Sequence, residues 1–122
     1  MLYTSFFSNK NNKIGVIIGI ARITPKSIRQ LINFAPSYDL VRAMKAGELS
    51  QKQYTEYYLK CLDEDKTIPI IAENLKEYEN DEKRHLIFCC YCKEGFCHRH
   101  LLRKYLQEKY NLKIQELPEE VN

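Results

Sequence analysis

Two short apolar segments constrain the fold of this chain more than any other feature. Residues 13–20 and 85–91 are almost entirely apolar and rich in residues that favour strands. An apolar run of this length without alternating polar positions is typical of a strand that is buried on both faces, at the centre of a parallel sheet. We therefore expect two such strands, covered by helices.

The rest of the chain predicts strands and helices in alternation. Residues 2–7 have the composition of a first strand, residues 98–110 that of a helix, and residues 112–117 that of a half-buried edge strand. Three further helices are expected between the two apolar segments, over residues 38–46, 51–62 and 69–79. This order predicts a single α/β domain over residues 1–122, with three layers and a mostly parallel sheet that carries helices on both faces.

Side chains near the helix starts support these boundaries. Ser37 is suited to cap the first of the three helices, and Ser50 with Gln53 has the spacing of a capping box at the second. The spacing of apolar residues along that second helix predicts one buried face, formed by Tyr54, Tyr57, Tyr58 and Cys61. We interpret these tyrosines as core and groove lining rather than as a platform for stacking nucleic-acid bases.

Cysteine usage and charge limit the compartment and the partners. The chain has five cysteines, four of them between residues 89 and 97, an odd and crowded set that argues against a disulfide framework. Free thiols favour the reducing cytoplasm. The apolar run at residues 14–20 is too short to cross a membrane, so we expect no membrane partner. The net charge of +3 is compatible with a small anionic ligand, and a nucleic-acid partner stays open.

The candidate site lies where the predicted strands end. Ligands of open parallel sheets bind beyond the carboxyl ends of the strands, where this chain has Ser5, Arg22, Cys92 and Lys93. The helix that begins after the second apolar segment adds free N–H groups, which favour an anion. Arg99 and Lys93 would supply positive charge beside it. The alternative is that both are solvated loop charges.

Cys97 and His98 are the candidate catalytic pair. A thiol at a helix N-terminus, next to His98 and Arg99, should have a pKa below the free value of about 8.5. Cys92 is a second candidate nucleophile, and the alternative for Cys97 is packing or capping alone. Cys89 and Cys90 lie within the apolar strand and are expected to be core residues.

Two sharper mechanisms fit the spacing poorly. A tyrosine-phosphatase-like loop needs an arginine six residues after its cysteine, and Cys92 to Arg99 is one residue longer. A zinc site would have to be built from Cys92, Cys97, His98 and His100, whose spacing is not a standard one and whose histidines diverge on a helix. We therefore expect no metal and no cofactor.

The segment from residue 90 to residue 102, with its Cys97-His98-Arg99 triplet, resembles the C-terminal signature of the bacterial and phage family called domain of unknown function 488. In that family a strand ending in a cysteine is followed by a short loop, a Cys-His-Arg triplet and a helix. Further similar segments are found at residues 4–7, 35–40, 45–49 and 54–58. The resemblance implies no assigned activity. Many members have an acidic residue where this chain has Cys92, so a mechanism that needs a carboxylate there is not supported.

These observations predict a protein that binds a phosphate- or nucleotide-type ligand at the strand carboxyl ends, with cysteine-dependent chemistry as the enzymatic hypothesis. Its substrate would be a nucleotide, or a base or phosphate of nucleic acid. The alternative is a non-catalytic nucleotide sensor, or a small phage or host interaction module, that uses the same pocket. The sequence predicts neither the reaction nor the oligomeric state, and leaves open whether the protein is an enzyme.

Overall fold

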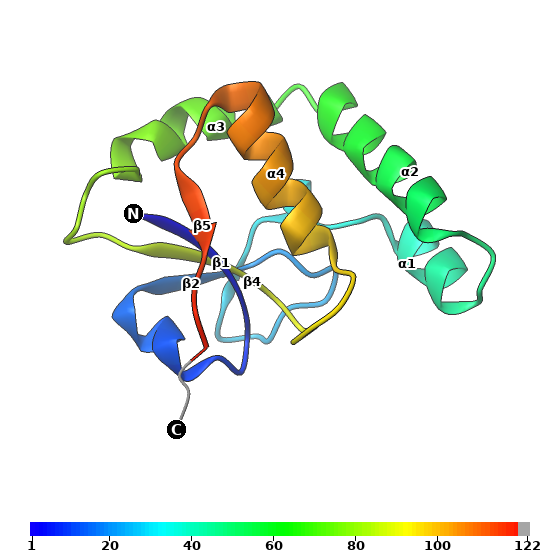
Figure 1. Cartoon of the computed structure of the whole chain (residues 1–122), viewed down its shortest axis with the longest axis horizontal. Helices are drawn as coiled ribbons and strands as arrows, with labels where there is room; N and C mark the ends of the chain where they lie inside the picture. The colour runs from blue at the N-terminus through cyan, green and yellow to red at the C-terminus, as the bar shows by residue number, and fades with distance from the viewer. Residues whose placement is uncertain (120–122) are drawn as a thin grey trace.

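Five parallel strands form the sheet in the computed structural model, which describes residues 1–119 (Figure 1). The strands are β1 (Leu2–Phe6), β2 (Val16–Gly19), β3 (Arg29–Gln30), β4 (Leu86–Cys90) and β5 (Ile114–Glu116). Their order in the sheet is β3-β2-β4-β1-β5. Leu86 at the start of β4 pairs with Leu2 of β1 on one side and Val16 of β2 on the other. The predicted α/β fold with a parallel sheet is confirmed, and the second apolar segment forms its central strand.

In the described part of the chain, four α-helices and three short 3-10 helices connect the strands. The α-helices are α1 (Tyr38–Lys45), α2 (Gln51–Glu64), α3 (Ile68–Leu75) and α4 (His98–Tyr110). The 3-10 helices are η1 (Lys10–Ile14), η2 (Ile32–Phe34) and η3 (Lys76–Tyr78). Both predicted caps are confirmed, because the Ser37 hydroxyl accepts a hydrogen bond from the N–H of Leu40 and Ser50 forms a capping box with Gln53.

The two faces of the sheet are covered differently. All four α-helices pack with Phe88 and Cys90 of β4 in one hydrophobic cluster, whereas Ile87 and Cys89 face a second cluster without helical residues. In Figure 1, α3 and α4 lie above the strands and η1 lies below them. The opposite face therefore carries a 3-10 helix rather than an α-helix. The connection between β1 and β2 spans residues 7–15, which is shorter than the usual crossover that contains an α-helix.

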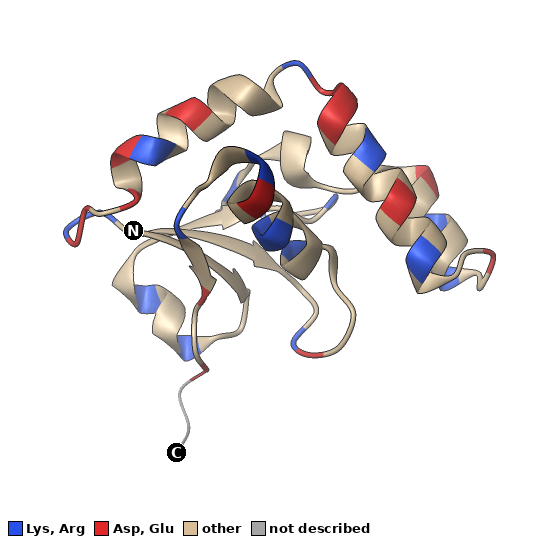
Figure 2. Ribbon diagram, turned by 45° about the horizontal axis from the view of Figure 1, so that its top comes forward, with Lys and Arg blue, Asp and Glu red and all other residues tan. Residues whose placement is uncertain are grey.

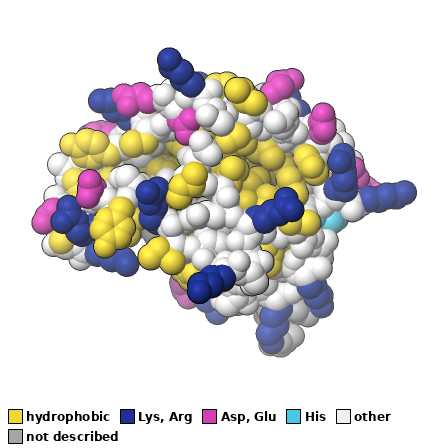
Figure 3. All heavy atoms as spheres, turned by 180° about the vertical axis from the view of Figure 1, so that it is seen from behind, with side chains coloured by type: hydrophobic (Ala, Val, Ile, Leu, Met, Phe, Trp, Pro, Cys, Tyr) yellow, Lys and Arg dark blue, Asp and Glu magenta, His cyan; other side chains and the backbone are white. Residues whose placement is uncertain are grey.

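The β2 side of the sheet is less covered than the sequence suggested. β3 was not predicted because it consists of two polar residues, and it pairs only with Ile18 and Gly19. The start of β2 therefore lies at the sheet edge, and Val16 is 55% exposed although the apolar run predicted burial on both faces. Seen from behind, the molecule shows a broad gathering of hydrophobic side chains with Lys and Arg side chains placed singly around it (Figure 3).

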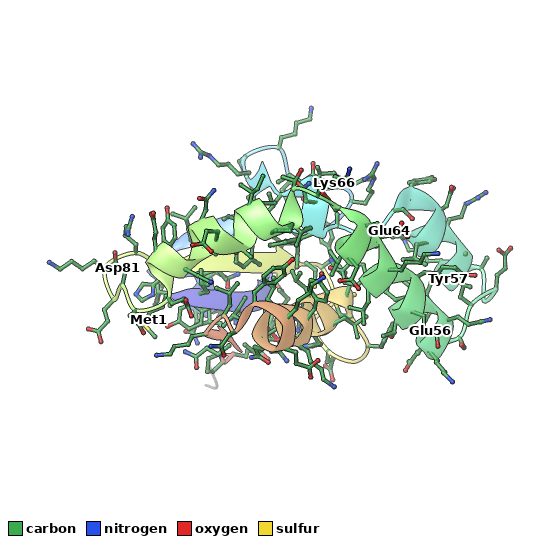
Figure 4. The ribbon with its side chains drawn as sticks, turned by 90° about the horizontal axis from the view of Figure 1, so that it is seen from above. Met1, Glu56, Tyr57, Glu64, Lys66 and Asp81 are labelled. Carbon is green, nitrogen blue, oxygen red and sulfur yellow. The ribbon has the colours of Figure 1, made fainter. Side chains whose placement is uncertain are left out.

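Helices α1 and α2 lie beside the carboxyl end of β4 (Figure 1). α2 turns Tyr54 and Tyr58 into the core, as predicted, whereas Tyr57 and Cys61 are exposed, so their predicted burial is wrong. Tyr57 points away from the sheet in Figure 4, and basic and acidic residues alternate along α2 in Figure 2. The buried stripe of α2 is therefore narrower than its spacing suggested.

The start of the chain is fixed at the other end of the sheet. The amino group of Met1 donates a hydrogen bond to the carbonyl oxygen of Asp81 at 2.8 Å, and the two residues lie together in Figure 4. Within residues 1–119, none of the helices has the length and apolar character needed to cross a bilayer.

Candidate active site

A cavity of about 520 Å³ opens at the carboxyl ends of β2 and β4. Its walls come from α1, from Tyr54 of α2 and from the loops that follow the two strands. The walls are mainly apolar: Ala21, Ile23, Val41, Met44 and Phe96. Arg22 and Lys45 are its two Lys or Arg residues, and none of the described residues that line it is acidic. The cavity thus lies beyond the carboxyl ends of two strands, where the sequence analysis placed the candidate site.

Arg99 does not line this cavity. Its side chain connects β5 to the loop after β4 and is not a free cation. Its side chain is 3% exposed, and its guanidinium donates to both carboxylate oxygens of Glu116, at 2.9 and 3.2 Å. Further donors reach the Cys90 sulfur at 3.1 Å, the carbonyl oxygen of Lys93 at 3.2 Å and the carbonyl oxygen of Cys92. The predicted anion-binding role does not fit this geometry, because these donors are already used within the protein.

Cys90 and Cys97 form a pair of thiols in contact. Cys90 ends β4, Cys97 is the N-cap residue of α4, and their sulfur atoms are 2.9 Å apart. The hydrogen bond from Cys97 and the bonds from Arg99 lower the pKa of Cys90, although burial opposes this. The same hydrogen bond to Cys90, together with burial, raises the pKa of Cys97. The predicted low pKa of Cys97 is therefore wrong, because its contact with Cys90 and its burial both favour the protonated thiol.

His98 is a neutral, fixed ring on the cavity wall. Its Nε2 lies 2.7 Å from the carbonyl oxygen of Ile20 and so carries the proton that it donates there. Burial lowers the pKa of His98 to about 4, so the ring is uncharged near neutral pH. Its Nδ1 is then an acceptor and lies 3.8 Å from the Cys97 sulfur. His98 thus ties the loop after β2 to the start of α4.

Two of the predicted ligand-binding residues line the cavity together with His98. Arg22 follows β2 and Cys92 follows β4, and both are exposed. Their places on neighbouring loops follow from the adjacency of β2 and β4 in the sheet. Of the four residues predicted at strand ends, Arg22 and Cys92 therefore share the cavity.

Ser5 and Lys93 do not line the cavity. Ser5 is fully buried, and its hydroxyl accepts a hydrogen bond from the Asn9 side chain at 3.0 Å, on the side of η1. Successive residues of a strand point to opposite faces, so Ser5 is turned away from the helix-covered face. Lys93 is exposed and forms an ion pair with Glu119 at 3.0 Å, as in the alternative of a solvated loop charge.

Three important residues were not predicted. Cys90 is a core residue, as predicted, with 1% exposure, but the sequence does not predict that it also lines the cavity. Its spacing of two residues from Phe88 along β4 is the signal that places it on the helix-covered face. Glu116 occupies a polar position in the alternating segment of β5, which did not reveal its partner. Lys45 at the end of α1 carried no signal beyond its charge.

The residues of the zinc alternative are not gathered around one point. Nδ1 of His100 lies 2.9 Å from Arg103 and 3.6 Å from Glu116, so this ring belongs to the charged cluster beside β5. Cys97 is in contact with Cys90 instead. Across residues 1–119, no three His, Cys, Asp or Glu side chains are placed to hold one metal ion.

Comparison with known proteins identifies a family for this chain. A family model described as DUF488-N3a, the active DUF488-N3 subclade, matches residues 3–110. The matched range runs from β1 to the end of α4 and so includes the Cys-His-Arg triplet and the cavity walls. No curated protein and no solved structure matches the chain. The description of the subclade names no reaction.

Proposed function

The chain belongs to the DUF488 family, in its DUF488-N3a subclade, and from this premise we propose that its cavity binds a small nucleotide-type ligand that reacts with Cys90. The observation that carries the proposal is the composition of the cavity. It combines apolar and aromatic walls, two basic side chains and a buried thiol of lowered pKa. The proposed ligand is the nucleotide-type ligand of the sequence analysis, and the proposed nucleophile is Cys90 rather than Cys97.

The shape and charge of the cavity suit a ligand with a flat apolar part and an anionic part. Its volume of about 520 Å³ is within the usual range for small-molecule sites. Tyr54 and Phe96 pack edge to face at 5.4 Å and supply an aromatic wall for a base. Arg22 and Lys45 are exposed and available for a phosphate, in contrast to Arg99.

Cys90 is the group best prepared for chemistry. A thiolate is the nucleophilic form of cysteine, and here the Cys97 thiol and the Arg99 guanidinium stabilise it. The neutral His98 offers Nδ1 as a proton acceptor close to Cys97. In this arrangement the Cys90 sulfur would form a bond to an electrophilic ring carbon of the bound base. The ring double bond at that carbon would break, and the atom at its other end would take up a proton from water in the cavity. Cys97 and His98 would hold Cys90 in position.

One observation favours the non-catalytic alternative. Cys90 is only 1% exposed, so a ligand must reach it through the cavity. A nucleotide sensor would use the same walls and the same basic side chains without any reaction at the thiol. The two functions share the ligand and differ in the behaviour of Cys90.

The binding claim is tested by calorimetry with nucleoside monophosphates, the matching nucleosides and inorganic phosphate. We expect the monophosphates to bind best, and Arg22→Ala to weaken them by about tenfold, the size expected for one lost hydrogen bond to a charged group. Val41→Trp should block the cavity and abolish binding of monophosphates and nucleosides alike. Lys10→Ala, on η1 at the opposite face of the sheet, is the matched control and should bind as the wild type does. Absence of binding to all nucleotides, or unchanged binding to Val41→Trp, would contradict the proposal.

A further inference from the structure

We infer that Cys90 and Cys97 are a reversible redox pair, converted to a disulfide by a hydroperoxide that enters through the cavity. This modification site goes beyond the proposed function and does not depend on a nucleotide ligand. It rests on the placement of two thiols against each other at the base of a hollow. The residues of the pair come from the two ends of the loop between β4 and α4.

The contacts assign different roles to the two sulfur atoms. Cys90 lines the cavity, accepts a hydrogen bond from Arg99 at 3.1 Å and lies 2.9 Å from the Cys97 sulfur, so it is the sulfur prepared as a thiolate. Cys97 does not line the cavity, so an oxidant that enters there meets Cys90 first. Its side chain does not cap α4 and is directed toward Cys90.

The reaction proceeds in two steps that balance. The Cys90 thiolate attacks one oxygen of the hydroperoxide, forming an S–O bond and breaking the O–O bond. The other oxygen leaves as hydroxide or alkoxide and takes a proton from solvent water to become water or an alcohol, and Cys90 becomes a sulfenic acid. The Cys97 sulfur then attacks the Cys90 sulfur, and the S–O bond breaks as hydroxide takes the Cys97 proton and leaves as water. The two sulfurs together lose two electrons, which reduce the peroxide, and a thiol reductant reverses the change.

The remaining cysteines are placed differently. Cys89 faces the opposite side of the sheet, and burial raises its pKa to about 12. Cys61 is exposed on α2. Cys92 is exposed on the same loop and is the one competitor for the resolving role. The expected disulfide consumes the thiolate of Cys90, which is one of the hydrogen-bond acceptors of Arg99. Oxidation therefore switches the cavity wall between a thiolate form and a disulfide form.

The test treats the reduced, full-length protein with a small excess of hydrogen peroxide, blocks the remaining thiols and digests with trypsin. Cleavage after Lys93 separates Cys90, in the peptide 85–93, from Cys97, in the peptide 94–99. We expect these two peptides to appear as one adduct that dithiothreitol separates, with fragment ions placing the bond on Cys90. In Cys97→Ser, the adduct should be lost and dimedone should capture a sulfenic acid at Cys90.

Two variants separate this result from its alternatives. Cys61→Ser is the matched control and should form the adduct as the wild type does, and Cys92→Ser should form it too. Loss of the adduct in Cys92→Ser, fragment ions that place the bond on Cys89 or Cys92, or no adduct while exposed Cys61 is oxidised, would each overturn the inference. Because the experiment contains no nucleotide, its failure leaves the proposed ligand untouched, and failure of nucleotide binding leaves the redox pair untouched.

Discussion

Arg99 is a charged side chain that the fold keeps almost entirely out of water. Burial alone lowers the pKa of a guanidinium, but the hydrogen bonds and charges of Cys90 and Glu116 hold the pKa of Arg99 above its ordinary value. The side chain also connects the loop after β4 to β5. In the Cys-His-Arg triplet, all three side chains therefore point inward and shape the surroundings of Cys90.

Replacing Arg99 with lysine tests this role. Lysine keeps the charge but cannot reproduce the planar set of donors, so Arg99→Lys should lower the free energy of unfolding by about 2 kcal/mol. It should also raise the pKa of Cys90 toward its ordinary value. Urea denaturation and the pH dependence of Cys90 alkylation measure the two effects. Arg103→Lys, at a partly exposed position beside Glu116, is the control, and equal effects in both variants would contradict the assigned role.

His98 should make stability depend on pH. Its pKa is about 4 in the folded protein and 6.5 ordinarily, so the unfolded chain binds more protons between these values. The stabilisation is complete above pH 6.5 and is lost as the pH falls toward 4, by about 3 kcal/mol in total. His98→Gln should have a flatter profile of unfolding free energy in this window. His100 and the carboxylates titrate in both proteins and cancel in the difference, so identical slopes would refute the assignment.

At the scale of elements, the end of β2 is fixed by a glycine. A Cβ atom on Gly19 would meet the side chain of Thr24, which folds back and donates a hydrogen bond to the carbonyl oxygen of Ala21 at 3.2 Å. This contact sets the course of the loop that carries Arg22 and Ile23 to the cavity. The packing of one strand end thus determines part of the cavity wall.

Gly19→Ala should therefore destabilise the protein by about 1–3 kcal/mol, the usual cost of an overpacked site. It should also weaken any ligand that contacts Arg22, because the loop must shift. The double variant with Thr24→Gly removes the obstructing side chain and should recover part of the stability. Thermal unfolding and calorimetry provide the two readouts, and a double variant no more stable than Gly19→Ala would show that Thr24 is not the cause.

At the scale of the whole molecule, most elements were predictable because each rests on local signals. Apolar runs, caps and helical spacing indicate β1, β4 and the four α-helices. The alternation of strands and helices along the chain indicates the α/β fold with a parallel sheet. β3 was not predictable because two polar residues at a sheet edge carry no local signal. The covering of one face by η1 alone depends on the length of a connection rather than on its composition.

The candidate site was predictable only in position. Arg22 and Cys92 line one cavity because the neighbouring strands β2 and β4 have neighbouring loops, whereas Ser5 and Lys93, also predicted from strand ends, do not line it. The roles of Arg99, Cys90 and Cys97 depend on contacts between residues that are separated in the sequence. Cys90 meets Cys97 across the loop between β4 and α4. The Glu116 carboxylate that engages Arg99 lies on the last strand, and no spacing in the sequence identifies that pairing.

The central claim is that Cys90, at the wall of the cavity, is the reactive thiol. It is tested most directly by alkylating the native protein with iodoacetamide across a pH series and locating the label by fragment ions of the peptide 85–93. We expect labelling of Cys90 to rise at a pH below the free thiol value of about 8.5, before Cys97 reacts, and to be slowed by a bound nucleoside monophosphate. A Cys90 that titrates at or above about 8.5, or that reacts after Cys97, would contradict the account.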